Sequence, residues 1–378
     1  MKTPLLALLL IACGPAPVQP LAPGPAPRAS PPPPPIAAEP DPIPVPAGPP
    51  TVIFVSAGSA ALSCSGHSLS LLEDGRALLV GQCELDGLRC GAVLFDPALN
   101  RWEVARSPGR PRVQHTATLL DDGRLLIAGG WATDDAPGAQ LPLRSTEIFD
   151  PQRGDWTAGT DLLLGRAQHT ATRQWDGTVF IAGGTINRRD QPPLPTDQTE
   201  VLSLDALSTE AFTRLAEARL GHTATAFARG LLLAGGRGLA GPAGSEVDLA
   251  PCTPPYALPT PPLMEHAAAR LPEGVLVIGA GAAGLLRDLE PEGWSPTSSP
   301  LETPSRPVLL ALRRGALFLV GGTTYAVVQE SRRYEPELEA WAPGPALAGL
   351  YQDGAGLELA DGRVLLVGMG AEISTGPL

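Results

Sequence analysis

The fold is decided by a stretch of the chain that reads His115-Thr116-Ala117-Thr118-Leu119-Leu120-Asp121-Asp122-Gly123-Arg124-Leu125-Leu126-Ile127-Ala128-Gly129-Gly130. Two short apolar segments flank an Asp-Gly turn, and the second segment runs into a pair of glycines. This pattern predicts a β-hairpin, because glycine adopts the positive φ that a tight turn between antiparallel strands requires. Close copies begin at His169 and His222, so we expect one unit to repeat along the chain.

The glycine that ends each hairpin recurs about every 48 residues, at Gly81, Gly129, Gly183, Gly235, Gly279, Gly321 and Gly368. Farther along several repeats, an aromatic residue is followed seven positions later by a tryptophan, at Phe95 and Trp102, Phe149 and Trp156, and Tyr334 and Trp341. These pairs predict a third and a fourth strand after each hairpin. Four strands in about 48 residues is the size of one propeller blade.

The glycine pair, the aromatic residue and the spaced tryptophan resemble the Kelch repeat, and the resemblance covers about residues 51–378. Kelch repeats form β-propellers of six or seven blades. With seven hairpins, the resemblance implies an all-β fold, namely a seven-bladed Kelch-like β-propeller. We expect it to follow a disordered Pro-rich linker, which the composition indicates. Only residues 371–378 follow the last hairpin, which leaves room for one more strand. We therefore expect Thr51–Val55 to supply the missing strand and close the ring.

The composition separates a linker from this body. Residues 14–50 hold 17 of the 44 prolines, which predicts a disordered or polyproline II segment. The chain carries 27 Lys and Arg against 39 Asp and Glu, a formal net charge of −12. Because nucleic acids attract basic surfaces, this balance argues against a nucleic-acid partner.

The start of the chain predicts export. A charged start with Lys2, followed by the apolar run Leu5–Ile11, is typical of a secretory signal peptide. Residues Leu10–Cys13 resemble the bacterial lipobox, which makes 1–13 a lipoprotein signal peptide and implies acylation of Cys13 as a membrane anchor. Alternatively, Cys13 is an incidental residue of an ordinary signal peptide. By resemblance to the known sorting rule, Gly14 after the cysteine implies the outer membrane of a bacterial cell envelope.

The connections between the second and third strands are the longest loops, and long loops on a rigid scaffold are common binding sites. We predict that an unidentified protein or glycan docks there on a monomeric propeller, although the repeat could also merely tolerate such loops. The candidate binding residues lie in loops 131–146 and 185–199 and are Trp131, Asp134, Asp135, Arg144, Asn187, Arg188, Arg189 and Asp190.

Polar residues also recur in phase with the repeat. All five histidines take one repeat position, at the start of the first strand: His67, His115, His169, His222 and His266. They predict either a ring that binds metal or, as we favour, a structural contact between blades. Arginine and glutamate recur as well, at Arg112, Arg166 and Arg219 and at Glu147, Glu200 and Glu246. We interpret them as inter-blade ion pairs rather than as a substrate-binding arginine set of the sialidase kind.

Two further patterns bear on catalysis. Some Kelch-like propellers are galactose-oxidase-type copper enzymes, so a carbohydrate-active enzyme is the alternative to a binding or scaffolding module. No cysteine and tyrosine can be paired from their spacing, and we predict no enzyme activity, no cofactor and no metal. The run Gly279–Gly284 matches the dinucleotide fingerprint, but Pro291 and Pro296 break the helix that a Rossmann unit needs.

Four cysteines remain beyond Cys13, namely Cys64, Cys83, Cys90 and Cys252. An exported chain with an even number of cysteines predicts disulfides. Three pairings are open, and we favour Cys83 with Cys90 because these two residues bracket the first long loop.

Overall fold

The computed structural model describes residues 52–59, 61–133, 141–187, 192–227, 230–241, 246–249, 266–279, 282–287, 294–297, 307–313, 317–320, 331–347, 354–368 and 370–378. The chain divides into two compact units, Met1–Thr51 and Val52–Leu378, and all described residues belong to the second. The signal peptide with Cys13 and the linker 14–50 therefore lie outside the described residues. None of the described helices is long and apolar enough to cross a membrane.

The described elements of the second unit are antiparallel strands and one short 3-10 helix, η1 (Pro336–Leu338). The first sheet contains β2 (Leu62–Leu71), β3 (Ala77–Leu85), β4 (Leu88–Asp96) and β5 (Arg101–Val104). The second contains β7 (Thr116–Leu119), β8 (Leu125–Ala128), β10 (Thr146–Asp150) and β11 (Asp155–Ala158). The third is six-stranded, with β12 (Arg166–Ala167), β13 (Thr170–Arg173), β14 (Val179–Ala182), β15 (Thr185–Ile186), β16 (Leu194–Ser203) and β17 (Ser208–Arg219).

The other sheets follow in chain order. The fourth has three described strands, β18 (Thr223–Phe227), β19 (Gly230–Ala234) and β20 (Glu246–Leu249). The fifth has β21 (Ala267–Leu271), β22 (Gly274–Gly279), β23 (Ala282–Arg287) and β24 (Trp294–Thr297), and the sixth has β25 (Val308–Ala311), β26 (Leu317–Val320), β27 (Ser331–Glu335) and β28 (Ala340–Pro343). The last has β29 (Ala355–Glu358), β30 (Val364–Val367), β31 (Ala371–Ser374) and β1 (Phe54–Ser56).

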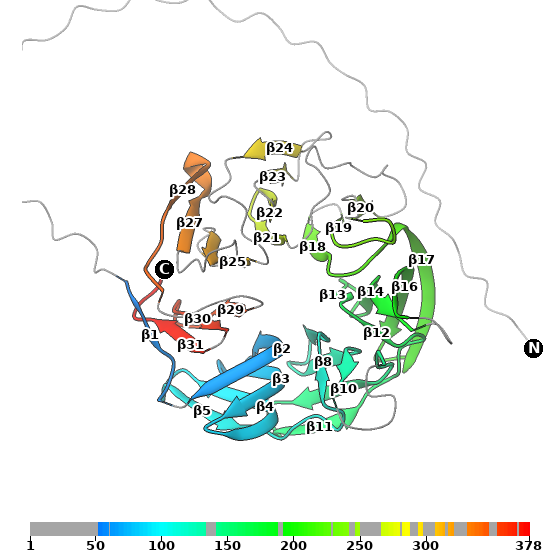
Figure 1. Cartoon of the computed structure of the whole chain (residues 1–378), viewed down its shortest axis with the longest axis horizontal. Helices are drawn as coiled ribbons and strands as arrows, with labels where there is room; N and C mark the ends of the chain where they lie inside the picture. Colours follow the sequence, from blue (N-terminus) through cyan, green and yellow to red (C-terminus); the bar gives the residue numbers. More distant parts are fainter. Residues whose placement is uncertain are drawn as a thin grey trace, which may run out of the picture. The chain divides into compact units, whose positions relative to one another are not determined.

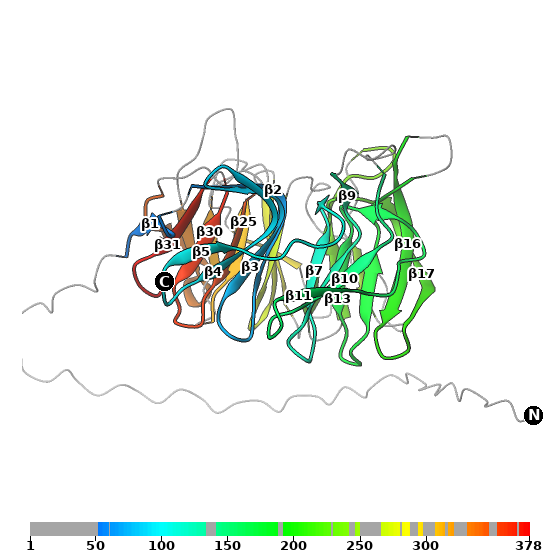
Figure 2. The same cartoon turned by 90° about the horizontal axis from the view of Figure 1, so that it is seen from below.

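This arrangement is propeller-like, and five of the described sheets are complete four-stranded blades. In Figure 1 the sheets of the second unit follow one another around a common centre, with the first strand of each hairpin innermost. Figure 2 shows the strands running between the two opposite faces of this unit. The all-β, propeller-like prediction is thus confirmed.

The hairpin predicted from residues 115–130 forms as expected. β7 pairs with β8 in a register that opposes Thr116 to Ala128 and Leu119 to Leu125. Gly123 makes the turn with φ of 79°. In the fifth repeat, β22 ends at Gly279 and a strand follows, not the helix that a dinucleotide site needs.

Strand β8 shows why the second strand of each repeat is apolar on both faces. Leu125 and Ile127 pack in a cluster with Leu78 and Val80 of the first sheet. Leu126 and Ala128 pack in another cluster with residues of the third sheet, such as Ile181. Alternate side chains point to opposite faces of a strand, so β8 contributes to the core on both sides of its sheet.

The aromatic signals mark a cross-strand contact between the third and fourth strands. Phe95 opposes Trp102, Phe149 opposes Trp156 and Tyr334 opposes Trp341. The ring centroids of these pairs lie 4.9, 5.0 and 5.1 Å apart, within the range of favourable aromatic pairs.

The predicted closure is also confirmed, with the closing strand at Phe54–Ser56 rather than Thr51–Val55. β1 pairs antiparallel with β31, the final strand of the chain, and opposes Phe54 to Ser374. The indole N–H of Trp102 in the first sheet donates to the carbonyl of Ala57, which follows β1, over 2.7 Å. The beginning of the unit is therefore held by its end and by the first sheet.

Candidate binding surface

The strand directions give the unit two different faces. We call the end that carries Gly129-Gly130 and Gly183-Gly184 the glycine-pair face, and the end that carries the Asp-Gly turns the turn face. Since β10 begins opposite the end of β8, the long loops between second and third strands lie on the glycine-pair face. The histidines, at the start of the first strands, lie on the same face, as predicted.

Two of the long loops stand on extra β-ladders at this face. β6 (Arg112–Val113) pairs with β9 (Trp131–Ala132), and β12 pairs with β15. Each ladder joins the segment that leads into a repeat to the start of that repeat's long loop. The loops of the second and third repeats therefore begin from hydrogen-bonded bases.

A buried ion pair between an arginine and a glutamate lies beside each of these two ladders. The Arg112 guanidinium lies 2.5 Å from a carboxylate oxygen of Glu147, and Arg166 makes the same pair with Glu200. Arg112 Nη1 also donates to the carbonyls of Gly129 and Ser145, over 2.9 and 2.8 Å. The arginine thereby satisfies carbonyls at both ends of the long loop.

The prediction of inter-blade ion pairs is corrected by this geometry. Each pair joins the segment before a repeat to the third strand of that same repeat, because Glu147 and Glu200 lie on β10 and β16. The carboxylate of Glu147 also accepts the N–H of Gly109 over 2.6 Å. In the fourth repeat Arg219 is buried and donates to the carbonyl of Gly235 over 3.0 Å; the side chain of Glu246 lies outside the described residues.

At the glycine pair, one repeat approaches the next closely. Gly129 and Gly130 have φ of 61° and 94°, a region that favours glycine. A Cβ on Gly129 would lie 2.4 Å from the carbonyl oxygen of Arg166 in the next repeat. The N–H of Gly130 donates to that same oxygen over 2.8 Å. The motif therefore forms an inter-repeat contact.

The histidines continue this contact from repeat to repeat. In four of the five histidines, Nε2 is hydrogen-bonded to the hydroxyl that follows the histidine of the preceding repeat, at 2.8 to 3.0 Å: His115 with Ser68, His169 with Thr116, His222 with Thr170 and His266 with Thr223. Burial lowers the pKa of His115 and of His222 to about 3. These imidazoles are therefore neutral near pH 7, and their geometry supports the structural reading over a metal ring.

A backbone ladder accompanies the histidines, and nothing in the sequence reasoning anticipated it. The N–H of Gln114 donates to the carbonyl of Gly66, Gln168 to Gln114, and Gly221 to Gln168, over 2.7, 3.1 and 3.0 Å. All four residues have positive φ, between 53° and 62°. In two of these repeats a glycine precedes the histidine, which indicates a positive φ at this position. In the other two a glutamine precedes it, so the sequence did not show that the conformation repeats.

The candidate loop residues are only partly described. Trp131 is half-buried and bridges to Pro142, while Arg144 is exposed and its Nε donates to the carbonyl of Leu162 over 2.8 Å. Asn187 is exposed just beyond β15. The other candidates lie outside the described residues: Asp134, Asp135, Arg188, Arg189 and Asp190.

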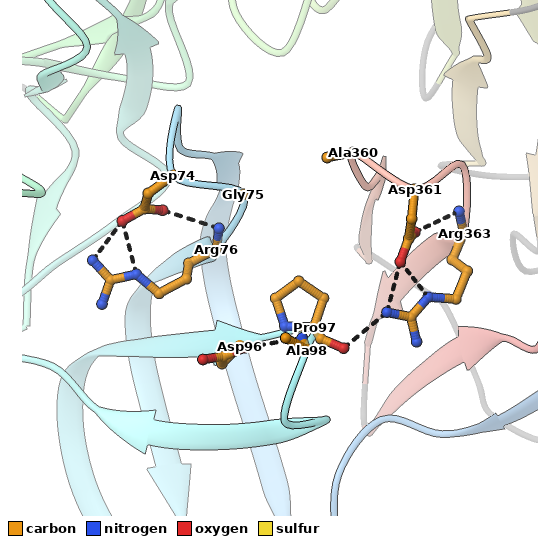
Figure 3. A pocket seen from close by; sticks show the side chains of 9 residues that line it. All are labelled: Asp74, Gly75, Arg76, Asp96, Pro97, Ala98, Ala360, Asp361 and Arg363. Atoms are coloured by element: carbon orange, nitrogen blue, oxygen red, sulfur yellow. Dashed lines mark hydrogen bonds and ion pairs between the residues drawn. The ribbon is translucent and has the colours of Figure 1, made fainter.

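The turn face carries a pocket of about 420 Å³ where the last sheet meets the first (Figure 3). Two ion pairs form within the turns that line it, Asp74 with Arg76 and Asp361 with Arg363, at 2.6 and 2.8 Å. Arg363 also donates to the carbonyl of Pro97 over 2.8 Å. In the same way, Arg76 of the first repeat donates to the carbonyl of Pro151 in the second repeat. The pocket thus lies at a repeated structural contact.

The prediction of a disulfide between Cys83 and Cys90 is wrong. Cys64 is bonded to Cys83, and Cys90 is a free thiol. Cys64 and Cys83 are directly opposed on β2 and β3, with Cα atoms 4.1 Å apart. Cys252 lies outside the described residues. Within the described part of the chain, no three His, Cys, Asp or Glu residues are grouped so that they could hold a metal ion.

Comparisons with known proteins agree with the architecture. No family model matches the chain. The adagio-like protein 2 of Oryza sativa subsp. japonica is 25% identical over 277 residues, covering 70% of this chain and 38% of the relative. "Adagio-like protein 1" of the same plant is 25% identical over 288 residues, covering 72% and 40%. The chain thus spans about two fifths of the length of these relatives.

One similar solved structure is a fungal alcohol oxidase of the AA5 family in complex with copper. It superimposes with a TM-score of 0.66 and 14% sequence identity, covering 86% of this chain and 76% of the oxidase. At that identity the likeness shows the fold alone. The relatives and this structure together support a Kelch-type β-propeller.

Proposed function

We propose that this chain is a binding or scaffolding module, a seven-bladed Kelch-like propeller that a lipid on Cys13 tethers to a bacterial cell envelope at the outer membrane. The observation that carries the binding role is the pair of extra ladders, β6 with β9 and β12 with β15. They hold the bases of two neighbouring long loops on one face. Loops on a rigid base can be elaborated for binding without loss of the fold.

The blade count is supported by the contacts of the innermost strands. The first strand of each hairpin contacts that of the next, in the order β2, β7, β13, β18, β21, β25 and β29, and β29 returns to β2. Seven innermost strands in one closed order fit seven blades.

The anchor rests on the sequence. The lipobox at Leu10–Cys13 and the proline-rich linker 14–50 place a lipid before a spacer of 37 residues. At about 3.1 Å per residue, a polyproline II spacer of this length holds the propeller up to ~115 Å from the membrane. Substituting Cys13→Ser should move the full chain from the membrane fraction to the soluble fraction; an unchanged distribution contradicts the anchor.

The binding face is tested by site-specific photo-crosslinking on cells that display the full chain. A photoreactive phenylalanine derivative at Asn187 or Arg144 reports on the glycine-pair face. The same group at Trp175, which is 95% exposed on the turn face, is the matched control. We expect a discrete adduct with an envelope protein or glycan from Asn187 and Arg144. Equal adducts from both faces, or none from the glycine-pair face, would refute the assignment.

An enzymatic role is tested separately. Purified full chain loaded with copper should release no hydrogen peroxide from galactose or simple alcohols above the level of buffer with copper. Copper-dependent peroxide release would favour the oxidase alternative over the binding role.

A further inference from the structure

Three cysteines lie in one row across three neighbouring strands of the first sheet. Cys64 on β2 opposes Cys83 on β3, and Cys83 opposes Cys90 on β4. Opposed residues of antiparallel strands have Cα atoms about 4.5–5.5 Å apart, which is within the reach of a disulfide. Cys83 can therefore be bridged from either side without a change in strand pairing.

The three side chains point to the same face of the sheet. Cys83 belongs to an apolar cluster that contains Leu365 and Ile373 of the last sheet, and Cys64 and Cys90 pack against the same cluster. The row consequently lies where the first and last sheets meet, next to the strand pairing that closes the unit.

The three sulfurs differ in their access to solvent. Cys83 in the middle is buried, with 3% of its surface exposed. Cys64 and Cys90 on the two sides are half-buried. An external thiol thus reaches the outer cysteines more easily than the central one, whereas Cys90 approaches Cys83 from within the sheet.

We propose that this row is a thiol–disulfide exchange site. The Cys90 thiolate attacks the sulfur of Cys83, the Cys83–Cys90 bond forms, and the Cys64–Cys83 bond breaks. Cys64 leaves with the bonding electron pair as a thiolate and takes up a proton. One disulfide and one thiol exist before and after the step, so it needs no external oxidant or reductant.

The exchange moves the covalent link from β2–β3 to β3–β4 and moves the free thiol from β4 to β2. The chemical class that this site would take is another thiol or disulfide, which could react at whichever outer cysteine is free. Burial raises the pKa of the Cys90 thiol. Because the thiolate is the attacking species, the exchange should be slow at neutral pH and faster at alkaline pH.

The test uses the full chain, purified without reductant and held in its folded state at pH 8.5. Samples are quenched with acid, free thiols are labelled with a maleimide, and the protein is digested with trypsin. Arg76 and Arg89 separate the three cysteines into different peptides, so mass spectrometry reads each label and each linkage. We expect the label on both Cys90 and Cys64, with Cys64 carrying at least about one twentieth of it. Label on Cys90 alone at all times overturns the proposal.

Two variants complete the test. Cys90→Ser should hold the Cys64–Cys83 bond permanently, and Cys64→Ser should contain a Cys83–Cys90 bond. Label on both Cys83 and Cys90 in folded Cys64→Ser protein would overturn the proposal. A disulfide that includes Cys252 in the wild-type samples would also overturn it, since that product requires scrambling beyond the row.

Discussion

Lowering the pH from 7.5 to 5 should destabilise this unit through its buried histidines. Burial is the main cause that lowers the pKa of His115 and His222 to about 3, and the charges of Arg112 and Arg219 add to it. Burial also lowers the pKa of His266 to about 4 and that of His169 well below its usual value. In the unfolded chain each imidazole returns to a pKa of about 6.5.

The direction of the effect follows from proton binding. Between pH 6.5 and the folded pKa values, the unfolded chain binds protons that the folded unit does not. The stability from these neutral histidines is therefore complete above pH 6.5 and is lost as the pH falls below it. At pH 5 each of the three groups with a pKa of about 3 or 4 costs about 2 kcal/mol relative to pH 7.5, so these three cost about 6 kcal/mol. His169 shifts the stability in the same direction. Carboxylates contribute little in this window, because their unfolded pKa values lie near 4.

The measurement is urea unfolding of the full chain at a series of pH values between 5 and 8. Near pH 5, each buried histidine adds about 1.4 kcal/mol per pH unit to the slope of the unfolding free energy. In the variant His222→Gln, an amide replaces the imidazole that bonds Thr170 and cannot titrate, so the slope should fall by about that amount. A flat profile from pH 7.5 to 5.5, or an unchanged slope in the variant, would refute the argument.

Four further predictions concern the repeat contacts. Deleting residues 51–58 removes β1 and the carbonyl that Trp102 binds, and should lower the melting temperature by roughly 10 °C in a thermal scan. Arg166→Met leaves the buried Glu200 carboxylate unpaired, and should cost about 3–5 kcal/mol in urea unfolding. Gly184→Ala places a Cβ 2.6 Å from a carbonyl oxygen at φ of 92°, and should cost about 2 kcal/mol or more in the same assay. Gln114→Gly relieves a φ of 53° at an exposed position, and should stabilise the protein by up to about 1 kcal/mol.

The first three of these changes have matched controls. A Gly-Ser segment in place of residues 51–58 separates loss of the strand from loss of chain length. Arg76→Met removes a partly exposed ion pair and should cost less than about 1 kcal/mol; an equal cost in Arg166→Met contradicts the role of burial. Gly75 has φ of 86° and open space around its Cβ position, so Gly75→Ala reports backbone strain alone. If it costs as much as Gly184→Ala, close approach is not what selects the glycine pair.

The fold could be predicted because its signals are local and repeated. The Asp-Gly turn at Gly123 and the apolar strand that follows it define a hairpin within sixteen residues, and the same pattern recurs along the chain. Closure could be predicted as well, since the last hairpin lacked a strand that Thr51–Val55 could supply. Both inferences use only spacing and hydrophobicity.

The partners of the polar residues could not be predicted in the same way. Spacing places an arginine and a glutamate in phase in three repeats, as at Arg112 and Glu147, but does not say whether they meet within one repeat or across two. The disulfide shows the same limit, because Cys83 is opposed by Cys64 on one side and by Cys90 on the other. Only the three-dimensional positions of the strands decide which neighbour is bonded.

These outcomes bear on where function resides in the unit. The residues that repeat in phase form the contacts on which the repeats depend: arginines on loop carbonyls, glycines against the next repeat, and histidines on neighbouring hydroxyls. A side chain that is required in every repeat for such a contact is not available to recognise a partner. For the proposed binding role, we therefore expect specificity to come from residues that break the repeat, such as Arg144 and Asn187 beside the extra ladders. For this reason the crosslinking experiment places its probes at those two positions and not among the repeated histidines.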